Sequence, residues 1–197
     1  MEKWLSTKQD KVWDELVASR LAKRFNEPKH LLMLKKAASL FKGKSAIDIG
    51  CGFAQLSQFL PEGIEYVGVD QSEPMLKKAY EAFPDARLIN GNIYDLEIRK
   101  FDTVFAIDFL HHQPDLEPAF SNLMSLTKRR LIISLWIWGR VPKAKKKYLG
   151  YHGEIISWNS TEDLEKRFSG LCYKKIEKVG RKWRDIYYFD MKKEVNA

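Results

Sequence analysis

Short apolar runs alternate with amphipathic stretches along most of this chain. Runs near residues 45–49, 65–69, 86–89, 101–107 and 131–136 have the length and the apolar character of buried strands. Stretches with helical periodicity lie between them, and this alternation is typical of a parallel sheet with helical crossovers. The pattern therefore predicts an α/β domain with five parallel strands.

The carboxyl-terminal end departs from this alternation. Strand-like segments at about 172–179 and 185–192 are separated only by Gly180 to Arg184. A crossover helix needs a dozen or more residues, so this short gap can join only antiparallel neighbours. We therefore expect a hairpin that adds two strands to the sheet.

The amino-terminal end is helical. The segment from Thr7 to Phe25 has apolar residues at helical spacing, Pro28 interrupts the pattern, and Leu31 to Phe41 predicts a second helix. We expect residues 1–40 to form a helical cap that belongs to the same domain as residues 41–197.

A glycine-rich turn follows the first predicted strand. Ser45-Ala46-Ile47-Asp48-Ile49 leads into Gly50-Cys51-Gly52, a helical segment is expected next, and the second strand ends in Asp70. Such a unit holds a nucleoside-bearing cofactor, because the turn lets the backbone approach the ligand and the acid accepts hydrogen bonds from the ribose hydroxyls. A ligandless sheet with an ordinary turn is the alternative.

Two cofactor classes compete for this turn. A dinucleotide requires a third glycine, where this chain has Gln55. Asp48, just before the turn, would repel a pyrophosphate but suits a ligand with a positive amine. These residues disfavour a nicotinamide dehydrogenase and favour S-adenosylmethionine (SAM), with S-adenosylhomocysteine (SAH) as its product.

At this motif the chain resembles the class I SAM-dependent methyltransferases, of the methyltransferase-11/25 type, whose first motif is an acid, any residue, Gly, any residue and Gly. The resemblance covers about residues 40–192. It implies a three-layer Rossmann-like α/β sandwich with a mostly parallel seven-stranded sheet, an antiparallel carboxyl-terminal hairpin strand and amino-terminal cap helices. A Pro-Gly-Gly type turn, common in the family before the fifth strand, is absent here.

The resemblance also implies roles for individual residues. The residues before and within the turn would hold the methionine end of SAM, Asp70 the ribose, and Asn92 with Ile93 the adenine, close to Met75. Packing of Met75 in the hydrophobic core is an equally good interpretation of its position. The expected cofactor-binding residues are Asp48, Gly50, Gly52, Asp70, Gln71, Met75, Asn92, Ile93 and Asp108.

Catalytic candidates follow the fourth strand. Asp108 ends this strand, and Leu110-His111-His112 comes next, a sequence that matches a common methyltransferase pattern. A sulfonium methyl group is already activated, so alignment carries most of the catalysis, and a general base is needed only for a protonated nucleophile. We expect Asp108 and His111 to act here, and no metal, because the histidines lack nearby Cys or acid ligands at metal-binding spacing.

Charge is unevenly distributed. The 197 residues include 34 Lys and Arg against 26 Asp and Glu, for a net charge of +8, and no acid occurs between Pro118 and Gly153. Arg140, Lys143, Lys145, Lys146 and Lys147 follow the fifth predicted strand, so a nucleic acid or acidic substrate is a possible partner. A solvated lysine run is the alternative. The expected substrate-binding residues are Trp138, Lys143, Tyr148, Tyr151 and His152.

Two functions therefore remain open. One is a SAM-dependent methyltransferase that acts on a small molecule or on tRNA or other RNA. The other is a non-catalytic SAM-fold module that binds RNA or a partner protein through the basic loop at 138–159. The chain has no signal-peptide pattern and no apolar run near the length of a membrane span, and Cys51 and Cys172 are expected to be reduced thiols. A cytoplasmic protein is expected.

Overall fold

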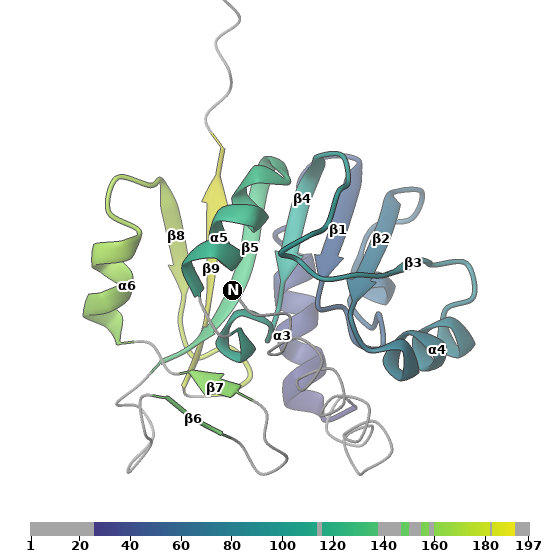
Figure 1. Cartoon of the computed structure of the whole chain (residues 1–197), viewed down its shortest axis with the longest axis horizontal. Helices are drawn as coiled ribbons and strands as arrows, with labels where there is room; N and C mark the ends of the chain where they lie inside the picture. Colours follow the sequence, from purple (N-terminus) through teal and green to yellow (C-terminus); the bar gives the residue numbers. More distant parts are fainter. Residues whose placement is uncertain are drawn as a thin grey trace, which may run out of the picture.

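A mixed seven-stranded sheet forms the centre of the molecule (Figure 1). The computed structural model describes residues 26–113, 116–137, 147–149, 155–157, 160–181 and 183–191. Across the sheet the strands run in the order β3 (Arg87–Asn90), β2 (Glu65–Asp70), β1 (Ser45–Ile49), β4 (Phe101–Ala106), β5 (Thr127–Trp136), β9 (Arg184–Asp190) and β8 (Tyr173–Ile176). Only β9 runs antiparallel to its neighbours in this sheet, which confirms the predicted strand arrangement.

Helices cover both faces of the sheet and make three layers. Helices α5 (Leu116–Ser125) and α6 (Thr161–Arg167) share one apolar cluster with the strands, whereas α3 (Pro28–Ala38) belongs to a second cluster. Successive side chains of β1 lie on opposite faces of the sheet, so that Ile47 belongs to the first cluster and Ala46 to the second. Helix α4 (Glu73–Ala82) packs against β2 and β3.

Three local expectations are corrected. The second helix, α3, runs from Pro28 to Ala38 and not from Leu31 to Phe41, and Pro28 begins it, since a first-turn residue needs no amide donor. The helix expected at Thr7 to Phe25 lies outside the described residues. The crossover after the glycine turn has a single 3₁₀ turn, η1 (Ser57–Phe59), in place of a longer helix, and Pro61 follows soon after it. Strand β5 begins at Thr127, so the cations 128–130 lie within the strand and not before it.

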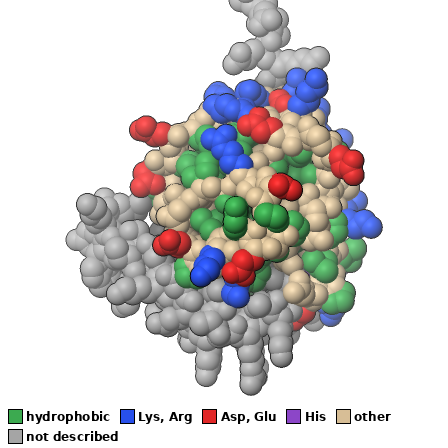
Figure 2. Space-filling view, turned by 90° about the vertical axis from the view of Figure 1, so that its right-hand side faces the viewer, with side chains coloured by type: hydrophobic (Ala, Val, Ile, Leu, Met, Phe, Trp, Pro, Cys, Tyr) green, Lys and Arg blue, Asp and Glu red, His purple; other side chains and the backbone are tan. Residues whose placement is uncertain are grey.

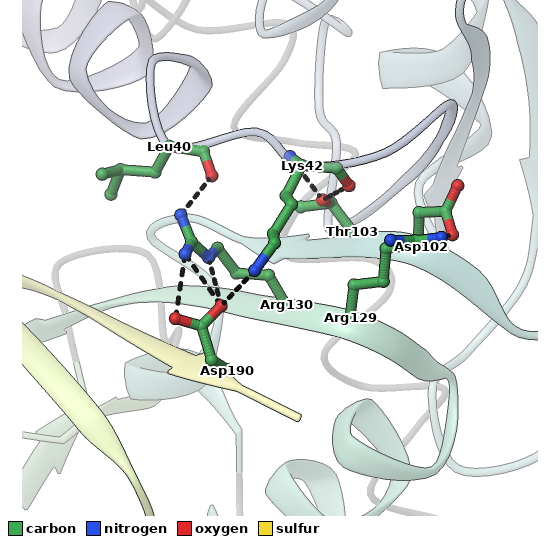
Figure 3. Close-up of polar contacts among 7 residues, drawn as sticks. All are labelled: Leu40, Lys42, Asp102, Thr103, Arg129, Arg130 and Asp190. Atoms are coloured by element: carbon green, nitrogen blue, oxygen red, sulfur yellow. Dashed lines mark hydrogen bonds and ion pairs between the residues drawn. The ribbon is translucent and has the colours of Figure 1, made fainter. Parts of the chain in front are cut away.

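Two of these cations, Arg129 and Arg130, form ion pairs with acids at the amino-terminal edge of the sheet. Arg130 donates from two nitrogens to the Asp190 carboxylate, each at 2.9 Å, and a third nitrogen donates to the Leu40 carbonyl at 3.0 Å (Figure 3). Lys42 Nζ lies 3.4 Å from the same carboxylate. The neighbouring Arg129 pairs with Asp102 at 2.9 Å. This edge joins β5 and β9 to the segment between α3 and β1.

A small two-stranded sheet lies at the opposite, carboxyl-terminal edge. Strands β6 (Lys147–Leu149) and β7 (Ile155–Ser157) pair antiparallel, and β7 lies against η2 (Leu110–His112), the turn that follows β4 (Figure 1). The sequence patterns did not predict this pair. The contact places β7, which belongs to the 138–159 loop, beside the turn that follows β4.

The surface on the β3 and α4 side carries mixed charge. In its described part, acidic and basic side chains lie among hydrophobic ones (Figure 2). Tyr80 of α4 is 61% exposed. The excess positive charge of the chain therefore does not gather on this part of the surface.

Two further observations concern the described residues alone. None of the helices they form is long and apolar enough to cross a membrane. Both thiols are free, with Cys51 buried and Cys172 exposed, as the sequence predicts.

Candidate functional site

The glycine-rich turn joins β1 to the adjacent end of β2. Gly50 and Gly52 both have positive φ, at +72° and +53°, in a region that residues with a Cβ rarely adopt. The amides of Gly50 and Cys51 both donate to the Val69 carbonyl, at 2.8 and 3.0 Å. Among the described residues, a Cβ built on Gly52 would meet only the Met75 sulfur, at 3.7 Å. The turn is therefore compact, and Gly52 leaves room beside the backbone.

The Asp70 carboxylate binds this turn. Its Oδ2 accepts the Gly52 amide and its Oδ1 accepts the Ser72 amide, each at 2.9 Å. Ser72 caps α4 by accepting the Met75 amide at 3.4 Å. The acid at the end of β2, the glycine turn and the start of α4 thus meet at one point.

Asp48 of β1 is buried and is bonded to a tyrosine of the neighbouring strand β2. Its side chain accepts a hydrogen bond from the Tyr66 hydroxyl at 3.1 Å, and the residue is 4% exposed. Burial raises the pKa of Asp48 to about 7. The Tyr66 hydrogen bond opposes this shift, and the nearby charge of Asp70 adds to it. A role for Asp48 toward a bound amine stays a prediction.

The residues expected near adenine lie beyond β3. Asn92 donates to the Gln71 side chain at 3.4 Å, and its own oxygen accepts the Tyr94 amide at 3.2 Å. Ile93 is buried in the larger apolar cluster, and its carbonyl accepts a hydrogen bond from Asn122. Because β2 and β3 are parallel with Asp70 opposite Asn90, these residues lie at the same sheet edge as Asp70. Their contact with adenine stays a prediction.

Asp108 lies at the centre of a polar cluster at the end of β4. Its carboxylate oxygen Oδ1 accepts from the Ser134 hydroxyl and from the Trp136 indole, each at 3.2 Å. Its Oδ2 accepts from Arg184 Nη2 at 2.5 Å and lies 3.9 Å from His30 Nδ1. Sequence reasoning singled out Asp108 but none of these four partners, which come from α3, β5 and β9.

His111 is buried beside this cluster. Its ring stacks on Trp136 with centroids 4.1 Å apart, and the His112 ring is 4.0 Å away. Neither ring nitrogen of His111 has a hydrogen-bond partner among the described residues. Burial lowers the pKa of His111 well below its usual value, and the positive charge of Arg184 and the neighbouring His112 act in the same direction. The imidazole is therefore neutral, and contact with an acceptor would require its neighbours to move.

The remaining predicted positions lie in the basic and aromatic loop. Their side chains fall outside the described residues: Trp138, Arg140, Lys143, Lys145, Lys146, Lys147, Tyr148, Tyr151 and His152. Among the described residues, no three His, Cys, Asp or Glu side chains come together in a way that would hold a metal ion.

Part of this chain is similar to known methyltransferases. Residues 47–130 match the family described as a methyltransferase domain. The chain is 34% identical over 94 residues to a ubiquinone biosynthesis O-methyltransferase of Coxiella burnetii, a match that covers 44% of this chain and 40% of that protein. It is 27% identical over 108 residues to phosphoethanolamine N-methyltransferase 2 of Caenorhabditis elegans, covering 50% of this chain and 25% of the relative. The chain thus spans well under half the length of these relatives.

Solved structures show the same fold. Magnesium protoporphyrin IX methyltransferase of Synechocystis, crystallised with SAH, superposes with a TM-score of 0.72 at 18% identity and covers 95% of this chain and 100% of its own. A SAM-dependent methyltransferase of Thermotoga maritima gives 0.71 at 17% identity, with 93% and 100% coverage. Residues 47–130 thus match a methyltransferase domain, and the sheet has the fold of the class I SAM-dependent methyltransferases.

Proposed function

We propose that this chain binds SAM at the carboxyl ends of β1 and β2 and transfers its methyl group to an acceptor. The bridge that Asp70 forms between Gly52 and Ser72 carries this proposal. Each carboxylate oxygen can accept two hydrogen bonds, so a ribose diol can be held beside the two backbone donors. The room beside Gly52 fits a nucleoside that approaches the backbone closely.

When bound, SAM supplies a methyl group whose bond to sulfur breaks as its bond to the acceptor nucleophile forms, which leaves SAH. The glycine turn and Asp70 bind and orient the ligand, and alignment of the reacting atoms is the main contribution asked of the protein. The packing of the next residue, Phe109, against Gly50 supports a role for Asp108 in orienting the acceptor or the methionine end. Burial and the lowered pKa make His111 a weak base, so a role in accepting a proton from a hydroxyl or amine acceptor would require its neighbours to move and expose the ring.

A small molecule is the acceptor that the comparisons favour, because the named relatives include a ubiquinone biosynthesis O-methyltransferase and a phosphoethanolamine N-methyltransferase. A nucleic acid or an acidic substrate is the second candidate. It is supported by the basic run at 140–147 and by the position of β7 beside η2.

Calorimetric titration with SAM and SAH tests cofactor binding. The wild type should bind both, and Asp70→Asn should lose most of the affinity because the ribose acceptor is weakened. Asp85→Asn removes a carboxylate in the exposed turn before β3 and should bind as the wild type does. A wild type that binds NADH and not SAM would refute the proposal and favour a dehydrogenase. A wild type that binds neither would refute it and favour a non-catalytic module.

Incubation with methyl-labelled SAM and fractionated cell extract tests the acceptor. Label in small metabolites supports the first candidate, and label in RNA supports the second. SAM binding without label transfer to any fraction would contradict the proposed transfer to an acceptor.

A further inference from the structure

Asp108 has an unusual backbone conformation. Its φ is +53°, in the left-handed region that residues other than glycine seldom occupy, although Asp tolerates it better than most. Its amide donates to the Ser134 hydroxyl of β5 at 2.7 Å. Such a conformation persists where the surrounding structure holds it in place, and it occurs often at functional sites.

Arg184 contributes the cation that holds the Asp108 side chain. It is the first residue of β9 and pairs in register with Trp136 of β5. Its side chain is only 5% exposed, and it lies 2.5 Å from Oδ2 while the Trp136 indole donates to Oδ1. Donors from two strands therefore act on the two oxygens, which fixes the orientation of the carboxylate as well as its position.

The Asp108 turn also contacts the glycine turn. A Cβ built on Gly50 would come within 2.4 Å of the Phe109 ring, so the residue after Asp108 packs directly against the cofactor turn. A shift of Asp108 would carry Phe109 with it and change the shape of the turn where SAM is proposed to bind.

We propose that Arg184 is a positioning residue for methyl transfer, acting through Asp108 to hold the 107–109 turn against Gly50. This inference rests on the proposed function. Removing the arginine would leave a nearly buried carboxylate without its closest cation, and the turn would be expected to rearrange to reach water. SAM and its acceptor would then be misaligned.

The protein offers a matched control at the other edge of the sheet. Arg130 of β5 also pairs with an aspartate, Asp190 of β9 (Figure 3). That pair lies at the amino-terminal edge, away from the glycine turn. If Arg184 served only to fasten β9 to the sheet, Arg184→Gln and Arg130→Gln would have comparable effects.

The experiment titrates SAH into the wild-type chain of 197 residues and into Arg184→Gln, Arg184→Lys and Arg130→Gln. We expect Arg184→Gln to weaken SAH binding by roughly tenfold or more, because loss of a residue that holds a binding group in position commonly has an effect of that size. Arg184→Lys retains a cation and should recover part of the affinity, and Arg130→Gln should keep it. Equal SAH affinity in Arg184→Gln and the wild type would overturn the inference. Absence of SAH binding by the wild type would instead refute the proposed function.

A double-mutant cycle with Asp108→Asn tests whether Arg184 acts through Asp108. Adding Arg184→Gln to Asp108→Asn should cause little further loss of SAH affinity. Losses that simply add would overturn the inference. The comparison of Asp108→Asn with the double variant remains a test even if Arg184→Gln alone does not fold. The double variant removes both charges of the pair and leaves no unpaired buried ion.

Discussion

The Tyr66 hydroxyl donates a hydrogen bond to the Asp48 carboxylate at 3.1 Å, across the neighbouring strands β2 and β1. Asp48 is 4% exposed, and burial raises its pKa to about 7. A carboxylic acid in an unfolded chain titrates near pH 4. The acid that opens the glycine motif is thus a buried group whose charge changes near neutral pH.

The first prediction concerns the pH dependence of stability. Because the folded pKa of Asp48 is raised, its contribution to stability is fully present below about pH 4 and is lost as the pH rises through about 7. Compared with Asp48→Asn, the wild type should lose up to about 1.4 kcal/mol of its free energy of unfolding for each pH unit between about pH 4 and about pH 7. Urea unfolding of both proteins at about pH 5 and about pH 8 measures this. A stability difference that is the same at both pH values would contradict it.

The second prediction concerns the glycine turn. Gly50→Ala would force a Cβ into the Phe109 ring, whereas at Gly63, with a similar φ of +74°, none of the described atoms lies within 4 Å. Gly63→Ala should therefore cost only the backbone strain, about 1–2 kcal/mol. Gly50→Ala should cost more and should also weaken SAH binding, by about tenfold for each 1.4 kcal/mol of misfit. Equal unfolding free energies for the two variants would count against the contact.

The third prediction tests the contact between the carboxyl-terminal hairpin and α3. A Cβ on Gly180 would lie 2.2 Å from the Lys29 carbonyl oxygen, while Gly170 has open space among the described residues. Both have positive φ, so the comparison isolates the collision with backbone. Gly180→Ala should lower the free energy of unfolding by about 1–3 kcal/mol more than Gly170→Ala does. Chemical denaturation measures both, and indistinguishable values would show that the hairpin shifts without cost.

The fourth prediction has the opposite pH dependence. Burial would raise the pKa of Asp190, but hydrogen bonds and the positive charge from Arg130, with Lys42 adding, outweigh it and lower the pKa. The contribution of ionised Asp190 to stability is therefore present above about pH 4 and is lost as the pH falls through its lowered pKa. Because Asp190 is 35% exposed, Arg130→Gln should cost only about 1 kcal/mol near neutral pH, and less in acid. Thermal unfolding in both conditions tests this, with Arg129→Gln, whose side chain is 58% exposed, as the milder comparison.

Strand positions followed closely from the sequence because their signal is local. Every residue of Ser45–Ile49 is buried, as an apolar run in the middle of a parallel sheet should be. The start of β5 at Thr127 was missed because the cations at 128–130 look like a loop. In the fold, Arg129 and Arg130 are neutralised by acids that stand far away in the sequence.

The glycine turn was visible in the sequence for the same reason. Gly50, Gly52 and Asp70 belong to a short motif in which spacing alone restricts the backbone, and their predicted meeting is what the structure shows. The expected helix after the turn is a single 3₁₀ turn, since Pro61 and Gly63 follow before a longer helix can form.

By itself the sequence determined the strand pattern, the glycine turn and the acid that closes it, because each depends on residues close together along the chain. Only the tertiary structure decided that Arg184 holds Asp108, 76 residues earlier, and that Tyr66 pairs with Asp48. Such contacts depend on which strands become neighbours and which ends share an edge. That order arises from burying the whole sheet between its helices, and local periodicity carries no record of it.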